Sequence, residues 1–91
     1  MKRYRCISKG KVQGVWYRRS VREMAEAAGF KGTVRNLPDG TVESVVDVSD
    51  EAALEAFKKI LYKGSPMSMV LDVQCEEIPP GRPFESFEVV R

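Results

Sequence analysis

Histidine is absent from this sequence of 91 residues, and cysteine occurs only twice, as Cys6 and Cys75. Histidine and cysteine are the usual ligands of zinc, and two cysteines this far apart in the sequence do not form a zinc motif. A Cys-x-x-Cys loop of the kind that carries a metal is absent as well. The sequence therefore predicts a protein without a metal or any other cofactor.

The same shortage leaves no histidine general base and no evident cysteine nucleophile. A cysteine phosphatase needs an arginine six positions after its cysteine, but Val12 stands six positions after Cys6. Any reaction catalysed by this chain has to proceed without these groups.

Long apolar runs are also missing. The basic stretch at the start of the chain, Met1–Cys6, is not followed by an apolar segment of signal-peptide or membrane-spanning length. We therefore expect a cytoplasmic protein with no membrane partner, in which Cys6 and Cys75 are reduced thiols.

Neither sign of charge is in large excess, since the net charge at pH 7 is only +2. This value is too small for a general binder of polyanions, and it argues against a nucleic-acid partner. Basic residues are nevertheless concentrated in the first 35 positions: Lys9, Lys11, Arg18, Arg19, Arg22 and Arg35. Any one of them fits a solvated surface, but their grouping favours a small anionic ligand.

The length and composition fit one domain that spans residues 1–91. Hydrophobic residues make up 43% of the chain and aromatic residues 9%. A chain of this size buries roughly 60 to 65% of its unfolded surface. We therefore expect a single core that folds without a disulfide or a metal.

Two amphipathic helices are predicted. The first has apolar residues at helical spacing from Val21 to Ala28, and Gly29 can end it with a left-handed residue. The second can be capped by Asp50 and should end near Lys63, ahead of a Gly64-Ser65-Pro66 corner. Its apolar stripe consists of Leu54, Phe57, Ile60 and Leu61.

Five segments are predicted to be strands: Tyr4–Lys9, Thr33–Asn36, Thr41–Val48, Met69–Cys75 and Phe87–Val90. The second and third strands flank Leu37-Pro38-Asp39-Gly40, which suits a tight turn between antiparallel strands. Three valines of the third strand share one face: Val42, Val46 and Val48. A proline-rich loop, Ile78–Pro83, precedes the last strand.

This order of elements is the split βαβ, ferredoxin-like arrangement with an extra final strand. The expected fold class is α+β, an antiparallel sheet of four to five strands with two helices packed on one face. Many unrelated activities use this arrangement, so the function has to be argued from the site.

The segment Gly10–Arg18 links the first predicted strand to the first helix and has the chemistry of a phosphate cradle. Glycines at both ends of the loop let successive N–H groups point at one anion, and the positive end of the helix dipole adds attraction. Arg18 offers a planar fork for two phosphate oxygens. Glycines between a strand and a helix are also common simply as turn residues, so the spacing alone is weak evidence.

Two motifs carry a resemblance to a known family. Gly10-Lys11-Val12-Gln13-Gly14-Val15-Trp16-Tyr17-Arg18 resembles the signature of the acylphosphatases, in which a Val-Gln-Gly-Val core precedes an aromatic residue and an arginine. Gly32-Thr33-Val34-Arg35-Asn36 followed by Gly40-Thr41-Val42 is similar to a second family motif, a glycine and a short strand that ends in asparagine. With the helix pattern and the Gly64-Ser65-Pro66 corner, the resemblance covers nearly the whole chain.

The resemblance implies an acylphosphatase, which hydrolyses the carboxyl-phosphate bond of an acyl phosphate. By resemblance, Arg18 and Asn36 are the catalytic residues, and Asn36 holds the attacking water. Phosphate binding falls to the loop with the Arg18 side chain, namely to Gln13, Gly14, Val15, Trp16, Tyr17 and Arg18. The partners expected are the acyl phosphate and inorganic phosphate, bound by a monomer.

This activity also fits the groups that the sequence lacks. A phosphate ester releases an alkoxide and needs an acid, whereas an acyl phosphate releases a carboxylate whose conjugate acid has a pKa of about 4 to 5. Positioning the water and holding the phosphoryl charge then suffice, which amides and one arginine can do. We expect a phosphate oxygen of the substrate to accept the proton of the water.

Two residues depart from the family pattern, and both bear on the acyl-group preference. Thr33 stands where the family usually has an aromatic residue, and Trp16 is bulkier than the residue common at its position. Trp16 can be a packing residue or a wall of the acyl pocket. Without the family, Asn36 would read as a turn residue before Leu37-Pro38.

Three other functions share the predicted fold. A single-stranded RNA binder would carry aromatics on its central strand, but Thr41–Val48 has none. A metal-carrying module would need the absent Cys-x-x-Cys loop. An acylphosphatase-like domain that handles carbamoyl phosphate, or regulates a larger assembly, stays open and would differ in turnover of acetyl phosphate.

Overall fold

The computed structural model describes residues 1–91 and contains five strands and two helices. In chain order the elements are β1 (Lys2–Lys11), α1 (Tyr17–Ala27), β2 (Lys31–Asn36), β3 (Val42–Val48), α2 (Glu51–Lys63), β4 (Met69–Ile78) and β5 (Phe87–Val89). Each predicted helix and strand is therefore present, and the predicted turn between β2 and β3 is confirmed.

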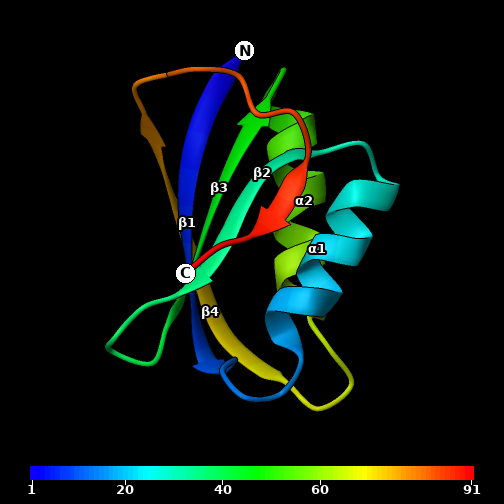
Figure 1. Cartoon of the computed structure of the whole chain (residues 1–91), viewed down its shortest axis with the longest axis vertical. Helices are drawn as coiled ribbons and strands as arrows, with labels where there is room; N and C mark the ends of the chain where they lie inside the picture. The colour runs from blue at the N-terminus through cyan, green and yellow to red at the C-terminus, as the bar shows by residue number, and fades with distance from the viewer.

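The strands form one sheet in the order β4-β1-β3-β2-β5, and both helices cover the same face of it (Figure 1). The pairs β1–β3, β1–β4 and β2–β3 are antiparallel, as predicted. The β2–β5 pair is parallel, so the sheet is mixed rather than purely antiparallel. The ferredoxin-like prediction is confirmed, with the added final strand at one edge of the sheet.

The core lies between the helices and the covered face of the sheet. The three valines predicted to share a face, Val42, Val46 and Val48, are all buried there. The ring of Phe57 on α2 packs 5.3 Å from Phe30 and 5.8 Å from Phe87, measured between centroids. These aromatic contacts join α2 to the connection between α1 and β2 and to β5.

Most helix boundaries follow from the signals in the sequence. Asp50 accepts a hydrogen bond from the amide of Ala53 at 2.8 Å, and α2 ends at Lys63. Gly29 has the expected left-handed backbone, with a φ of 83°. The strands β1 and β4 are longer than predicted because they pair with each other along most of their length, a contact that local alternation does not record.

The cysteines are joined in a disulfide, Cys6–Cys75, so the expectation of reduced thiols is wrong for this structure. The two residues are 69 positions apart in the sequence, but they lie directly opposite each other on the neighbouring strands β1 and β4. Sequence distance was therefore a poor guide to their separation in space. The bond ties the edge strand β4 to the interior of the sheet.

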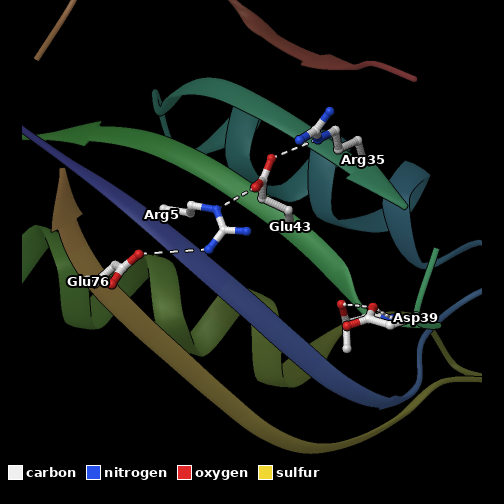
Figure 2. Close-up of polar contacts among 6 residues, drawn as sticks. Arg5, Arg35, Asp39, Glu43 and Glu76 are labelled. Carbon is white, nitrogen blue, oxygen red and sulfur yellow. Dashed lines mark hydrogen bonds and ion pairs between the residues drawn. The ribbon is translucent and has the colours of Figure 1, made fainter. Parts of the chain in front are cut away.

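The face of the sheet without helices carries a cluster of charges around Glu43 (Figure 2). Arg5 Nε donates to Glu43 Oε2, and Arg35 Nε donates to Glu43 Oε1 at 2.8 Å. Burial by itself would raise the pKa of Glu43, but the hydrogen bonds and charges of the two arginines outweigh it and hold the pKa below its usual range. Glu43 therefore links the three strands β1, β3 and β2 through its carboxylate.

The helices of this chain are too short and too polar to cross a membrane. Histidine, cysteine and carboxylate side chains do not gather anywhere in groups of three or more that could hold a metal ion.

Candidate active site

The loop between β1 and α1 is curled by two residues with left-handed backbone. Gly14 has a φ of 71°, and Trp16, the residue before the helix, has a φ of 64°. A left-handed conformation costs a glycine nothing, but it is uncommon for a bulky residue such as tryptophan. The strained residue therefore lies at the point where the loop enters α1.

The N-terminus of α1 is left open by the chain. No side chain caps it and its first turn holds no acidic residue, whereas α2 has both the Asp50 cap and Glu51. The backbone hydrogen bonds of the structure use none of the N–H groups from residue 13 to residue 19. Unused amides at the positive end of a helix dipole are the donors that an anion requires.

The side chains of three residues, Gln13, Ser65 and Tyr17, anchor this loop to the rest of the molecule. Gln13 Nε2 donates to the carbonyls of Leu37 and Thr41, at 2.8 and 2.9 Å, and so joins the loop to the turn after β2. Ser65 Oγ donates to the Val15 carbonyl at 2.6 Å. The third contact is made by Tyr17, the first residue of α1.

Tyr17 is buried and its hydroxyl has two partners. The hydroxyl donates to the Leu61 carbonyl at 2.7 Å and lies 2.9 Å from Ser8 Oγ, which donates to it in turn. Burial raises the pKa of Tyr17 to about 12, against the smaller lowering effect of the Ser8 hydrogen bond. Tyr17 is therefore a neutral anchor between the loop, β1 and α2 rather than a proton donor near neutral pH.

Two adjoining hollows open beside the loop. The first, which we call the cationic hollow, has a volume of about 690 Å³ and is lined by Arg18, Asn36, Val89 and Arg91. The second, the loop hollow, measures about 410 Å³ and is lined by Val12, Gly14, Trp16, Tyr17, Arg18, Arg19 and Val89. No acidic residue lines either hollow, and Arg18 takes part in none of the ion pairs of the structure.

Asn36 is the last residue of β2 and lines the cationic hollow together with Arg18. Its Oδ1 is buried and accepts no hydrogen bond from the chain. A half-turn about the Cβ–Cγ bond exchanges Oδ1 and Nδ2, so the carboxamide can present either a donor or an acceptor. A buried polar atom without a partner is costly, so this side chain is a candidate for binding a ligand.

The turn that follows Asn36 is closed by Asp39 (Figure 2). Asp39 Oδ1 accepts hydrogen bonds from the Thr41 hydroxyl at 2.6 Å and from the Thr41 amide at 3.0 Å. These two hydrogen bonds lower the pKa of Asp39. Because Gln13 binds the Thr41 carbonyl, this fixed turn also holds β2 in place beside the loop.

Trp16 is 67% exposed and lines the loop hollow. The Arg19 guanidinium lies 5.7 Å from the centre of its ring and also pairs with Glu23 at 3.0 Å. An exposed side chain contributes little to the core, so the position supports a pocket wall over a packing residue.

The structure brings the predicted pair Arg18 and Asn36 to the cationic hollow. Of the predicted phosphate-binding residues, Gly14, Trp16, Tyr17 and Arg18 line the adjoining loop hollow, whereas Gln13 and Val15 line neither hollow. Sequence reasoning missed the side-chain contacts of Gln13 and Ser65, and it missed Val89 and Arg91 as lining residues. Only Ser65 had a signal in the sequence, the corner after α2, and nothing in that corner pointed to Val15.

Comparison with known proteins gives one consistent family. The family model described as "Acylphosphatase" matches residues 4–89. The acylphosphatase of Nitrosococcus oceani is 49% identical over 83 residues, which cover 89% of this chain and 92% of that protein. The acylphosphatase of Rubrobacter xylanophilus is 42% identical over 97% of this chain and 79% of its own length.

Solved structures show the same relationship. The crystal structure of acylphosphatase from Bacillus subtilis superposes with a TM-score of 0.89 at 35% identity, and it covers all of both chains. The structure of HypF from T. kodakarensis superposes with a TM-score of 0.84 at 34% identity, covering 99% of this chain but only 12% of the HypF chain.

Proposed function

Because the chain belongs to the acylphosphatase family, we propose that Arg18 and the loop amides hold the phosphoryl group of its substrate while Asn36 orients the attacking water. The enzyme is a hydrolase of acyl phosphates, which it converts to a carboxylate and inorganic phosphate. The proposal concerns how its residues do this.

The proposed reaction is a single displacement at phosphorus. The water oxygen bonds to phosphorus, the bond from phosphorus to the acyl oxygen breaks, and the carboxylate leaves with the bonding electrons. A proton of the water passes to a phosphoryl oxygen, so the products are a carboxylate and inorganic phosphate. The leaving group needs no proton, and Tyr17, the nearest phenol, is held neutral and turned toward Leu61.

The main observation behind the proposal is that several hydrogen-bond donors without an acceptor lie together in the loop before α1. The N–H groups of residues 13–18 have no acceptor in the chain, and the adjacent Arg18 has no carboxylate partner. A phosphoryl group bound beside the loop would supply these donors with an acceptor, and the donors would stabilise the charge on its oxygens.

Asn36 is suited to the water for a related reason. Its carboxamide lines the same hollow as Arg18, and its oxygen is not engaged by the chain. A carboxamide can accept a hydrogen bond from the water and so fix the direction of the oxygen lone pair that attacks phosphorus. It carries no charge and therefore would contribute less than Arg18 to binding of the phosphate itself.

The test separates these two roles. Arg18→Ala should weaken inhibition by inorganic phosphate and lower turnover of benzoyl phosphate by at least about 10² to 10³, and Arg18→Lys should recover little. Asn36→Ala should retain phosphate inhibition near the original constant while turnover collapses. Arg22→Ala, an exposed arginine on the same helix that lines neither hollow, is the matched control.

Circular dichroism on each variant would verify that it is folded. If folded Asn36→Ala lost phosphate affinity as severely as Arg18→Ala, the division of roles would be wrong. Hydrolysis should also be unchanged by EDTA and far slower on p-nitrophenyl phosphate, and a loss on chelation that a divalent ion restores would contradict the metal-free mechanism.

The likeness to one part of HypF keeps a second role in view, as a domain of a larger carbamoyl-phosphate-handling or regulatory assembly. Relatives matched along most of their own length are acylphosphatases, which favours turnover as the role of this chain. Steady-state hydrolysis of acetyl phosphate by the purified protein distinguishes the two, because a regulatory domain would bind phosphate without turnover.

We further propose that residues 1–91 act as a single domain, as a monomer in the cytoplasm. Sedimentation would test the monomer. Because proteins of the cytoplasm generally keep their cysteines reduced, the state of the Cys6–Cys75 pair also reports on the compartment. If the proposed location is correct, a thiol-blocking reagent added to cells as they are lysed in denaturant should modify both cysteines. If instead all of the protein carried the Cys6–Cys75 disulfide, it would lie in an oxidising compartment.

A further inference from the structure

The Gly64-Ser65-Pro66 corner after α2 contacts the loop between β1 and α1 through one buried hydroxyl group. Ser65 Oγ donates to the Val15 carbonyl at 2.6 Å, across 50 positions of sequence, and Ser65 is only 5% exposed. Val15 is buried as well. This hydrogen bond therefore joins two buried residues from distant segments and is shielded from competition by water.

The direction of the Val15 carbonyl decides the direction of the next amide. In a trans peptide the carbonyl oxygen and the following N–H point to opposite sides, and this chain has no cis peptide bond. Because Ser65 holds the Val15 oxygen toward the buried corner, the N–H of Trp16 points in the opposite direction, away from Ser65. That N–H is one of the loop donors with no acceptor in the chain.

The peptide that Ser65 holds also lies next to the strained residue of the loop. Trp16 adopts a φ of 64°. This left-handed conformation is unfavourable for a residue other than glycine, and it persists only when surrounding contacts hold the backbone in place. Rotation of the Val15–Trp16 peptide would relieve the backbone and turn the Trp16 N–H out of the cradle. A hydrogen bond on the Val15 carbonyl opposes that rotation.

The corner that carries Ser65 is itself rigid. The Ser65 amide donates to Ser68 Oγ, and Ser68 Oγ donates back to the Ser65 carbonyl, both at 2.9 Å. Gly64 has a φ of 54°, and a Cβ at that position would collide with Ser68 Oγ and lie 2.8 Å from the Tyr17 ring. The hydroxyl of Ser65 is therefore presented from a fixed backbone rather than from a flexible loop.

From these contacts we infer that Ser65 is a positioning residue for catalysis, which aims the Trp16 amide at the phosphoryl group through its hydrogen bond to the Val15 carbonyl. This inference rests on the proposed role of the loop amides. Ser65 does not touch the substrate, and its effect passes through one peptide plane.

The variants for the test are Ser65→Ala, which removes the hydroxyl, and Ser65→Thr, which keeps it. Ser68→Ala is the matched control, because it removes hydrogen bonds of the same corner and leaves Ser65 Oγ on Val15. Ser65→Ala should raise the inhibition constant of inorganic phosphate and lower turnover of benzoyl phosphate, each about tenfold, the effect of one hydrogen bond. Ser65→Thr should restore both values, and Ser68→Ala, which loosens the corner but keeps the Ser65 hydroxyl on Val15, should change each clearly less than Ser65→Ala does.

Amide NMR adds a measurement, the phosphate-induced shift of the Trp16 amide resonance, that would not change if Ser65 only stabilised the fold. In the wild-type protein, inorganic phosphate should shift the Trp16 amide resonance, and in Ser65→Ala that shift at saturation should shrink. If Ser65→Ala does not fold, Ser65→Cys, which has nearly the same shape but a weak donor, replaces it and should give the same changes.

Three results would overturn the inference alone: unchanged inhibition and turnover in Ser65→Ala, failure of Ser65→Thr to restore them, or an equal loss in Ser68→Ala. A wild-type Trp16 amide that does not respond to phosphate would instead overturn the proposed cradle, and the role of Ser65 with it.

Discussion

At the scale of single residues, Trp16 combines an uncommon backbone with an exposed side chain. Trp16→Gly should change the ratio of benzoyl to acetyl phosphate turnover more than it changes inhibition by phosphate, because the side chain lines the loop hollow while the proposed phosphate contact is made by the backbone amide, which glycine keeps. Trp16→Gly should also be about 1 kcal/mol more stable than Trp16→Ala, since alanine keeps the penalty of the left-handed conformation. Urea unfolding and substrate competition measure the two effects.

An unchanged benzoyl-to-acetyl ratio in a folded Trp16→Gly variant would assign Trp16 to packing instead. Equal stability of the glycine and alanine variants would show that the backbone of residue 16 relaxes in solution.

The residues of the site differ in how far the sequence could identify them. Arg18 and Asn36 stand at the ends of local motifs, next to a helix start and a strand end, so their neighbourhood could be predicted from a few adjacent residues. The contact of Ser65 with Val15 could not, because it depends on how the corner after α2 packs against the loop. Arg91 and Val89 line the hollows only because β5 pairs with β2.

At the scale of secondary-structure elements, the Glu43 carboxylate joins three strands and makes their stability depend on pH. Its pKa is lowered in the folded state, so its contribution is complete above the ordinary value of 4.5 and is lost as the pH falls through the folded value. Glu43→Gln should therefore be less stable than the wild type at pH 7 by about 1.5 to 3 kcal/mol, the scale of hydrogen bonds to charged groups. Below pH 4.5 the two unfolding midpoints should converge.

Glu76→Gln is the control for this prediction. Glu76 lies 3.8 Å from the Arg5 guanidinium and is largely exposed (Figure 2), so its removal should have little effect at either pH. A constant difference between wild type and Glu43→Gln from pH 7 to pH 3 would show that the ionised carboxylate is not the source of the stability.

Element type was predictable where one face of a segment is apolar, as in α2 and β3. The direction of β5 was not, because three residues carry no pattern that distinguishes parallel from antiparallel pairing. The alternation of β1 is weak for a physical reason as well: Arg3 and Arg5 on its open face are neutralised by Asp47 and Glu43 from β3, a pairing that no local window contains.

At the scale of the whole molecule, the disulfide closes most of the chain into one covalent loop. Reduction should lower the free energy of unfolding by about 2 to 4 kcal/mol, because the unfolded chain regains freedom. It should leave turnover of the folded enzyme unchanged, since neither cysteine lines the loop hollow or the cationic hollow. Urea unfolding and benzoyl phosphate hydrolysis, each with and without dithiothreitol, measure both effects.

The variant Cys75→Ser supplies the comparison, because its unfolding midpoint should not respond to dithiothreitol. If the unfolding midpoint of the wild type were equally insensitive to dithiothreitol, the disulfide would contribute nothing to stability. The sequence could not predict this bond, since cysteine count and spacing say nothing of which strands become neighbours.

The parallel strand β5 has a consequence for when the enzyme becomes active during its synthesis. Val89 of β5 lines both hollows. The strand β1, which leads into the loop before α1, pairs with β3 on one edge and with β4 on the other, so it is paired on both edges only after β4 has formed. A nascent chain that has exposed the loop, Arg18 and Asn36 still lacks those supports. Such non-local pairings form slowly, and β4 and β5 leave the ribosome after the loop, Arg18 and Asn36. The enzyme therefore gains its activity only after β4 and β5 have been synthesised, although the motifs that identify it emerge in the first 40 or so residues.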